Sequence, residues 1–160
     1  MSPHAFAASE EEFQDIARWL VTGEILSNDL PPKYSSEEIL RRLVGRRSSM
    51  EARVKKNKND GSKLVSPEEL FRICTESRFE YAISGHSVHI HSPRQTRTPY
   101  WARTLDRVNP LHEPKVNPAS WSGDNIQLLS SVLNSVKNDN SNEELIRWYA
   151  DFMRSLEDAV

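Results

Sequence analysis

Residues 100–108 (YWARTLDRV) and residues 125–138 (NIQLLSSVLNSVKN) predict a strand, a loop, a second strand and a helix. The loop between the two stretches is polar and contains three prolines. Asp106 and Arg107 stand side by side where the first strand ends. Because neighbouring residues of a strand point to opposite faces, a simple salt bridge does not explain this pair.

Helix-capping patterns organise the rest of the chain. A serine that precedes a glutamate or a first-turn proline is typical of a helix start. The alternating residues 79–91, with Ser84-Gly85 in the middle, predict a β-hairpin. We therefore expect an α+β fold with N-terminal helices, a β-hairpin, a strand–strand–helix motif and a closing C-terminal helix. The predicted helix starts are Ser9, Ser35-Ser36, Ser66 and Ser141.

Size and composition limit the classes of protein to consider. The 160 residues suffice for one domain with a hydrophobic core. No apolar run approaches the ~20 residues of a membrane helix, and the first thirty or so residues do not resemble a secretory signal. Cys74 is the single cysteine, which excludes an internal disulfide and a multi-cysteine zinc site. We expect an intracellular protein without membrane contact and without structural zinc.

A basic segment lies inside an acidic chain. Residues 41–63 carry a formal charge of +7 while the whole chain carries −2, so the remainder carries −9. Such a segment suggests contact with a polyanion, and the alternative is an ordinary solvated helix face. The candidate nucleic-acid-binding residues are Arg41, Arg42, Arg46, Arg47, Arg53, Lys55 and Lys56.

Oxygen ligands and cations occur together in the strand–strand–helix region. Asp106 and Asn134 offer hard oxygen ligands of the kind that Mg²⁺ or Mn²⁺ accepts. Arg107 and Lys137 would add positive charge where the transition state of a phosphate reaction gains negative charge. The alternative for Asp106 is a plain strand-end residue, because aspartate is common where turns begin.

Residues 104–149, from TLDRV to NEELIRWY, resemble the phage and mobile-element branch of the HNH, or ββα-metal, endonucleases. That branch has a Leu-Asp-Arg-Ile-Asp strand end, an Asn-Val strand start, an Asn-x-x-Lys helix and a closing Glu-Glu-Leu or Glu-Glu-Phe helix. Upstream, residues 46–71 are similar to its basic helix and Ser-Pro-Glu-Glu-Leu segment, and residues 79–85 to its hairpin. The resemblance covers roughly residues 41–155.

The resemblance implies a role for five residues. Asp106 matches the metal-binding aspartate, and Asn134 matches the metal ligand on the helix. Asn125 matches the asparagine whose hydrogen bonds tie the loop to the helix. Arg107 stands where other HNH enzymes carry the general-base histidine, and Lys137 matches a lysine near the scissile phosphate. The implied cofactor is Mg²⁺ or Mn²⁺.

Three features depart from the family pattern. Asn109 replaces the second aspartate and cannot act as a base near neutral pH. Tyr81 replaces the hairpin cysteine, and a lengthened loop ends in Ala-Ser-Trp at Trp121 instead of Lys-Gly-Tyr. His112 in this loop is the local candidate for activating water, and its alternative is an ordinary exposed loop histidine.

The histidines of the predicted hairpin and several aromatic residues could be functional, but each group also has an ordinary structural explanation. His89 and His91 lie on the same side of a predicted strand, but solvent-facing histidines are the default and no third metal ligand is evident nearby. Four aromatic residues recur at helical spacing and are predicted to be core rather than a platform for base stacking. They are Trp19, Trp148, Tyr149 and Phe152.

The chain is predicted to divide near residue 34. Residues 1–34 form an N-terminal helical extension, which is a candidate contact for a homodimer or for a protein partner. Residues 35–160 form the HNH-like domain. Its parts are a basic helix over 35–58, a ββα-metal motif over about 100–138 and a closing helix over 141–158.

Three functions remain open on this basis. The first is a divalent-metal-dependent DNA endonuclease that hydrolyses phosphodiester bonds. The second is a catalytically impaired HNH-derived subunit that binds DNA or RNA, or serves in assembly. The third is a helical interaction module, which the order of the motifs favours least.

Overall fold

The computed structural model describes residues 9–26, 30–56, 64–90, 98–109, 123–138 and 140–158, and only the backbone of 49–50 and 53–56. None of the described helices has both the length and the apolar composition needed to cross a membrane. The described elements confirm the α+β class. They are α1 (Glu10–Thr22), α2 (Ser36–Lys56), α3 (Pro67–Glu76), β1 (Arg103–Arg107), a 3₁₀ turn (Gly123–Asn125), β2 (Ile126–Ser130), α4 (Ser131–Lys137) and α5 (Asn142–Asp158).

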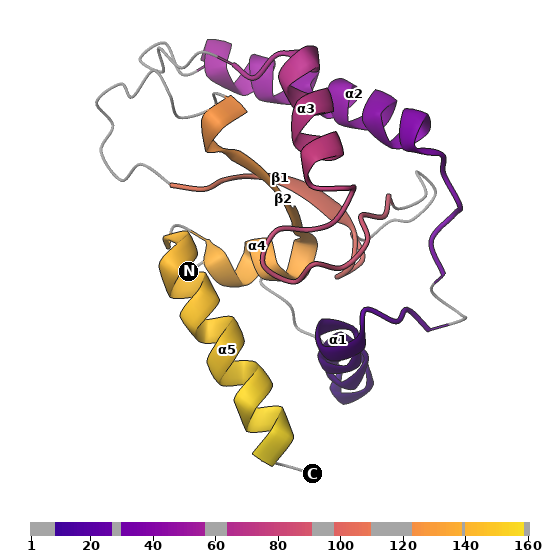
Figure 1. The fold of residues 1–160 in the computed structure, drawn as a ribbon, viewed down its shortest axis with the longest axis vertical. Helices are drawn as coiled ribbons and strands as arrows, with labels where there is room; N and C mark the ends of the chain where they lie inside the picture. Colours follow the sequence, from indigo (N-terminus) through magenta and orange to yellow (C-terminus); the bar gives the residue numbers. More distant parts are fainter. Residues whose placement is uncertain are drawn as a thin grey trace.

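The centre of the fold is the antiparallel pair β1–β2, in which Asp106 lies opposite Gln127 and Thr104 lies opposite Leu129. No residue separates β2 from α4, so the helix turns back directly onto the strands. Figure 1 shows the two strands between α2 and α3 on one side and α4 on the other. The predicted order of strand, strand and helix is confirmed, and most of the predicted loop, residues 110–122, lies outside the described residues.

The two faces of the strand pair differ chemically, because side chains alternate along each strand. Leu105 and Ile126 lie on the face toward α2 and α3, where they pack with Val65 and Leu70. Asp106 lies on the other face and contacts α4. One face is therefore an apolar contact, and the other carries a buried charge.

Helix α1 belongs to the main core. Trp19 is 0% exposed, and its ring meets those of Tyr81 and Tyr100 edge-on at 6.2 and 5.9 Å between centroids. The hydroxyl of Tyr149 on α5 donates a hydrogen bond of 2.7 Å to the carbonyl of Leu20. The division predicted at residue 34 therefore does not separate α1 from the core that the rest of the chain builds.

The predicted hairpin at residues 79–91 is a bridged turn rather than a pair of regular strands over its described residues, 79–90. Glu80 and Ser87 form a single antiparallel bridge, and Gly85 has a φ of 71°. The amide of Ala82 donates 2.9 Å to the carbonyl of Leu128, which attaches the turn to β2. Positive φ angles inside the turn interrupt the extended backbone that longer strands need.

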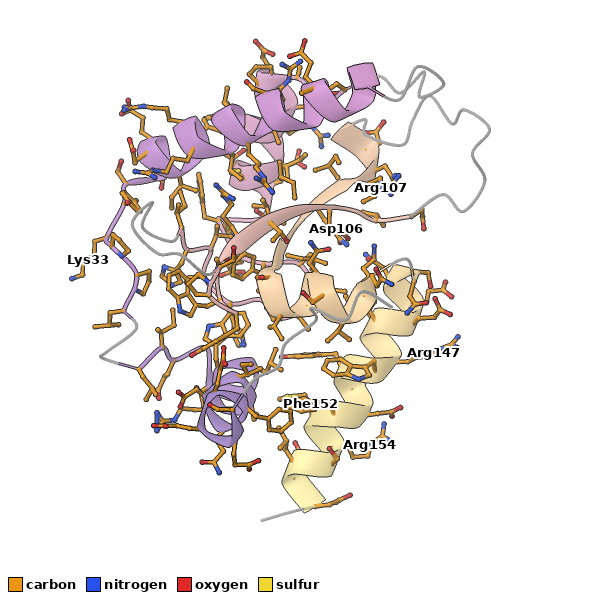
Figure 2. The ribbon with its side chains drawn as sticks, turned by 180° about the vertical axis from the view of Figure 1, so that it is seen from behind. Lys33, Asp106, Arg107, Arg147, Phe152 and Arg154 are labelled. Carbon is orange, nitrogen blue, oxygen red and sulfur yellow. The ribbon has the colours of Figure 1, made fainter. Side chains whose placement is uncertain are left out.

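The aromatic residues of α5 are less buried than predicted. Trp148 is 37% exposed and stacks on Phe152, with ring centroids 5.3 Å apart. Phe152 and Tyr149 are partly buried against the core, and Figure 2 shows Phe152 on the side of α5 that faces α1. The prediction of a core position is confirmed for Trp19 and wrong for Trp148.

The burial of Trp19 predicts a large effect on stability. We expect Trp19→Ala to lower the free energy of unfolding by about 3–5 kcal/mol, because it leaves a cavity between α1 and the core. Phe13→Ala on the same helix is the matched control, since Phe13 is 57% exposed. It is expected to change stability by no more than about 0.5 kcal/mol. Urea unfolding measures both, and similar small effects would contradict the assignment of α1 to the core.

Burial of His89 predicts a dependence of stability on pH. Burial lowers the pKa of His89 from its usual value of 6.5, because the charged ring loses hydration. The unfolded chain then takes up this proton at a higher pH than the folded chain. The contribution to stability is complete above 6.5 and is lost as the pH falls below 6.5. Urea midpoints at neutral and mildly acidic pH should therefore fall less for His89→Asn than for the wild type, and equal losses would contradict the prediction.

Candidate functional site

A buried ion pair joins β1 to α4. The ammonium nitrogen Nζ of Lys137 lies 2.8 Å from Oδ2 of Asp106 and also donates to the carbonyl of Arg107. The side chains of Lys137 and Asp106 are 0% and 11% exposed. At this depth each charge is stable only because the other is present, since a buried charge without a partner would lose its hydration without compensation.

The same network continues to α5. The side-chain amide of Gln127 donates 2.9 Å to Oδ2 of Asp106 and 2.7 Å to Oδ1 of Asn142. Asn142 in turn donates 2.9 Å to Oε1 of Gln127. The register explains the first contact, since Asp106 and Gln127 lie opposite each other on the same face of the pair. Both strands, the end of α4 and the start of α5 thus share one polar cluster.

Asp106 and Arg107 have separate surroundings. Asp106 lies on the face toward α4, whereas Arg107 pairs with Ile126, whose side chain lies on the face toward α2 and α3. Figure 2 shows the two labelled residues on opposite sides of β1. The adjacent carboxylate and guanidinium therefore do not converge on one point in this structure.

The donor set does not fit a divalent cation in this arrangement. Asp106 supplies one carboxylate, and its Oδ2 already accepts from the ammonium of Lys137. A divalent ion on the same oxygen would lie against that ammonium and be repelled. Asn134 lies one turn before Lys137 on α4 and is partly exposed. The described part of the chain contains no group of three or more His, Cys, Asp or Glu side chains arranged for a metal.

Asn125 closes the base of the loop that follows β1. Its Oδ1 accepts 2.9 Å from the amide of Asn109, and its Nδ2 donates 3.1 Å to the carbonyl of Asn109. The amide of Val108 also donates 2.8 Å to the carbonyl of Asn125. These contacts join Asn125 to Asn109 and Val108 at the end of β1. The role expected from the resemblance, in which Asn125 ties the loop to the helix, stays a prediction. His112, Trp121 and His91 lie outside the described residues.

The arginines of α2 differ in their partners. Arg41 is paired with Glu37 and Glu38, and its side chain is 69% exposed. Arg47 is held at its Nε by the carbonyl of Val65 at 2.6 Å and lies 3.7 Å from Glu51. For Arg53, Lys55 and Lys56 the helical backbone is described but the side chains lie outside the description.

The remaining two arginines of the predicted set lie near a residue that sequence reasoning missed. Arg42 and Arg46 are close enough to Arg103, the first residue of β1, to lower its pKa, although burial lowers it most. Strand alternation contained the signal: Arg103 is two residues before Leu105 and therefore shares its face toward α2. Arg42 and Arg46 on α2 thus lie near Arg103, on the face of β1 that is directed toward α2.

No family model matches the chain, and the searches of curated proteins and of solved structures found no match. The resemblance to the HNH endonucleases therefore stays a prediction from the sequence motifs.

A double-mutant cycle measures the buried pair. Asp106→Asn leaves the ammonium of Lys137 buried without an opposite charge, so we expect a loss of about 3–5 kcal/mol in unfolding free energy. Lys137→Met removes the other partner. The double variant should be destabilised by about 1–3 kcal/mol less than the sum of the single variants. Urea unfolding of all four proteins tests this, and additive effects would show that the two side chains do not interact.

Proposed function

We propose that the chain is a nucleic-acid-binding protein built on an HNH-like strand–strand–helix scaffold, with its catalytic centre impaired. The observation that carries the proposal is the ion pair of Lys137 with Asp106. In the family pattern the matching aspartate holds a divalent cation, and here a side-chain cation occupies that carboxylate. Asn109, which replaces the second family aspartate, supports the same function because it offers no base.

The basic surface of α2 supports contact with a phosphate backbone. Arg41 and Arg46 are exposed, and the segment 41–63 carries +7. The pairs of Arg41 with Glu37 and Glu38 are exposed and on the same helix, so they hold the guanidinium weakly. Phosphate oxygens are a better match for this planar donor. Contacts of this kind position a nucleic acid and read little of its sequence.

The second candidate is the divalent-metal-dependent DNA endonuclease. It is favoured by the position of Asp106 at the end of β1, facing the helix that carries Asn134. This is the order of elements that the ββα-metal motif requires. Under this function Lys137 would have to leave Asp106 before Mg²⁺ or Mn²⁺ bound there.

The expected contact of residues 1–34 with a second copy or a protein partner stays a prediction. Phe13 is 57% exposed and Val21 is 45% exposed on α1. Val21 also lines a hollow of about 370 Å³ with Met153 and Leu156 of α5. Val21 and the hollow beside it are the part of α1 that such a contact would cover.

Nucleic-acid binding predicts a steep dependence of affinity on salt. We expect the protein to bind a DNA or RNA duplex at low salt, and Arg41→Gln to reduce the slope of log K against log salt by about 1. Arg154→Gln is the matched control. Arg154 is 68% exposed and paired with an acid like Arg41, but it lies on α5, away from α2 (Figure 2). Fluorescence anisotropy over a range of salt concentrations measures both variants.

Nicking of supercoiled plasmid separates the two candidates. The wild type with Mg²⁺ or Mn²⁺ is expected to bind the plasmid and leave it intact. Nicking that EDTA stops and that Asp106→Asn abolishes would favour the endonuclease instead. Absence of binding to any nucleic acid at low salt would contradict both.

A further inference from the structure

Arg103 is a half-buried arginine without an acidic partner in the part of the chain that the structure describes. Its Nε is buried and has no hydrogen-bond partner among these described residues. No acidic side chain within the described ranges forms an ion pair with Arg103 or with Arg46. Its backbone amide donates 3.0 Å to the carbonyl of His89, which fixes the residue at the start of β1. A buried donor without an acceptor is uncommon in native proteins and asks for an explanation.

Two more guanidinium groups surround Arg103. Arg46 and Arg42 are one turn apart on α2, so both project from the same side of the helix. Burial and then the charge of Arg46 lower the pKa of Arg103, and Arg42 acts in the same direction. Arg42 is held in place, because its guanidinium lies 4.5 Å from the centroid of the Tyr34 ring and its Nε donates 3.1 Å to Glu38.

This arrangement is unfavourable for the protein alone. Arg46 and Arg103 repel each other, and Arg42 adds to this because its acidic partner Glu38 is shared with Arg41. Arg103 also gives up part of its hydration. An anion placed among them removes the repulsion, because it neutralises the charges. The planar guanidinium suits phosphate oxygens in particular. A purely packing role for the stem of Arg103 would explain its burial but would leave the three-charge cluster without a cause.

We infer that Arg42, Arg46 and Arg103 form a binding site for a phosphate group between α2 and the start of β1. The assignment of that phosphate to a nucleic-acid backbone rests on the proposed function. The site itself is independent of it, because free phosphate offers the same oxygens. Arg103 forms the inner wall, and the exposed Arg46 lies at the solvent side.

Thermal unfolding in phosphate and in chloride of equal ionic strength tests the site. Phosphate is expected to raise the Tm of the wild type above its value in chloride. Arg46→Gln and Arg103→Gln should each weaken phosphate binding by about ten-fold or more, the effect of one charged hydrogen bond. Arg154→Gln, which removes the same charge from α5, should bind phosphate like the wild type. Equal Tm values of the wild type in the two salts would overturn the inference.

Arg46→Gln decides the question even if Arg103→Gln does not fold, because Arg46 is exposed on α2. Arg103→Lys is the conservative variant: it keeps the charge, loses the planar fork and should bind phosphate more weakly than the wild type. Wild-type affinity in Arg46→Gln would overturn the inference.

A single-stranded oligonucleotide separates this inference from the proposed function. If the wild type binds phosphate through Arg46 but no oligonucleotide, the site stands and the proposed function fails. If the oligonucleotide binds equally well to the wild type, Arg46→Gln and Arg103→Gln, the proposed function stands and the assignment of the site to the nucleic-acid backbone fails. Weakened binding of both ligands in both variants is the result expected.

Discussion

The contact between Lys137 and Asp106 determines how the C-terminal half of the chain sits on the strands. Burying an ammonium group costs several kcal/mol, so it is tolerated only where opposite charge and further acceptors are in place. Asp106 and the carbonyl of Arg107 supply them at the end of β1. Helix α4 therefore has one favourable position on this face. The two hydrogen bonds between the side chains of Gln127 and Asn142 also fix the position of the first turn of α5 relative to β2.

Successive side chains of β1 point to opposite faces of the strand pair, and the two faces have different surroundings. Asp106 belongs to the interior cluster with α4, whereas its neighbour Arg107 lies on the other face of β1, which Arg103 shares. Asp106 and Arg107, which are adjacent in the sequence, therefore belong to two separate parts of the structure. The face of Asp106 stabilises the packing of α4, and the opposite face carries the arginines. This separation supports the proposal of an impaired catalytic centre. It leaves the proposed contact of the arginines with a polyanion unaffected.

Local signals in the sequence were sufficient for most helix ends, because caps depend on residues three or four apart. The side chains of Ser9, Ser66 and Ser141 accept from the third following amide, as their patterns predict. Long-range contacts were not accessible in this way. The burial of Lys137 depends on the packing of α4 over β1, and helical spacing alone did not reveal that Trp148 is exposed. His112 and three of the seven predicted basic side chains lie outside the described residues.

The side-chain bonds between Asn125 and Asn109 have a consequence for how this scaffold can vary. They fasten the two ends of the connecting segment next to the last rung of the ladder, where Arg107 lies opposite Ile126. The register of β1 and β2 is then fixed by these bonds at the end of the strand pair and not by the length of the connecting segment. The entropy of closing a connection grows only slowly as residues are added. A change in the number of residues between Asn109 and Gly123 should accordingly leave the register of β1 and β2 unchanged.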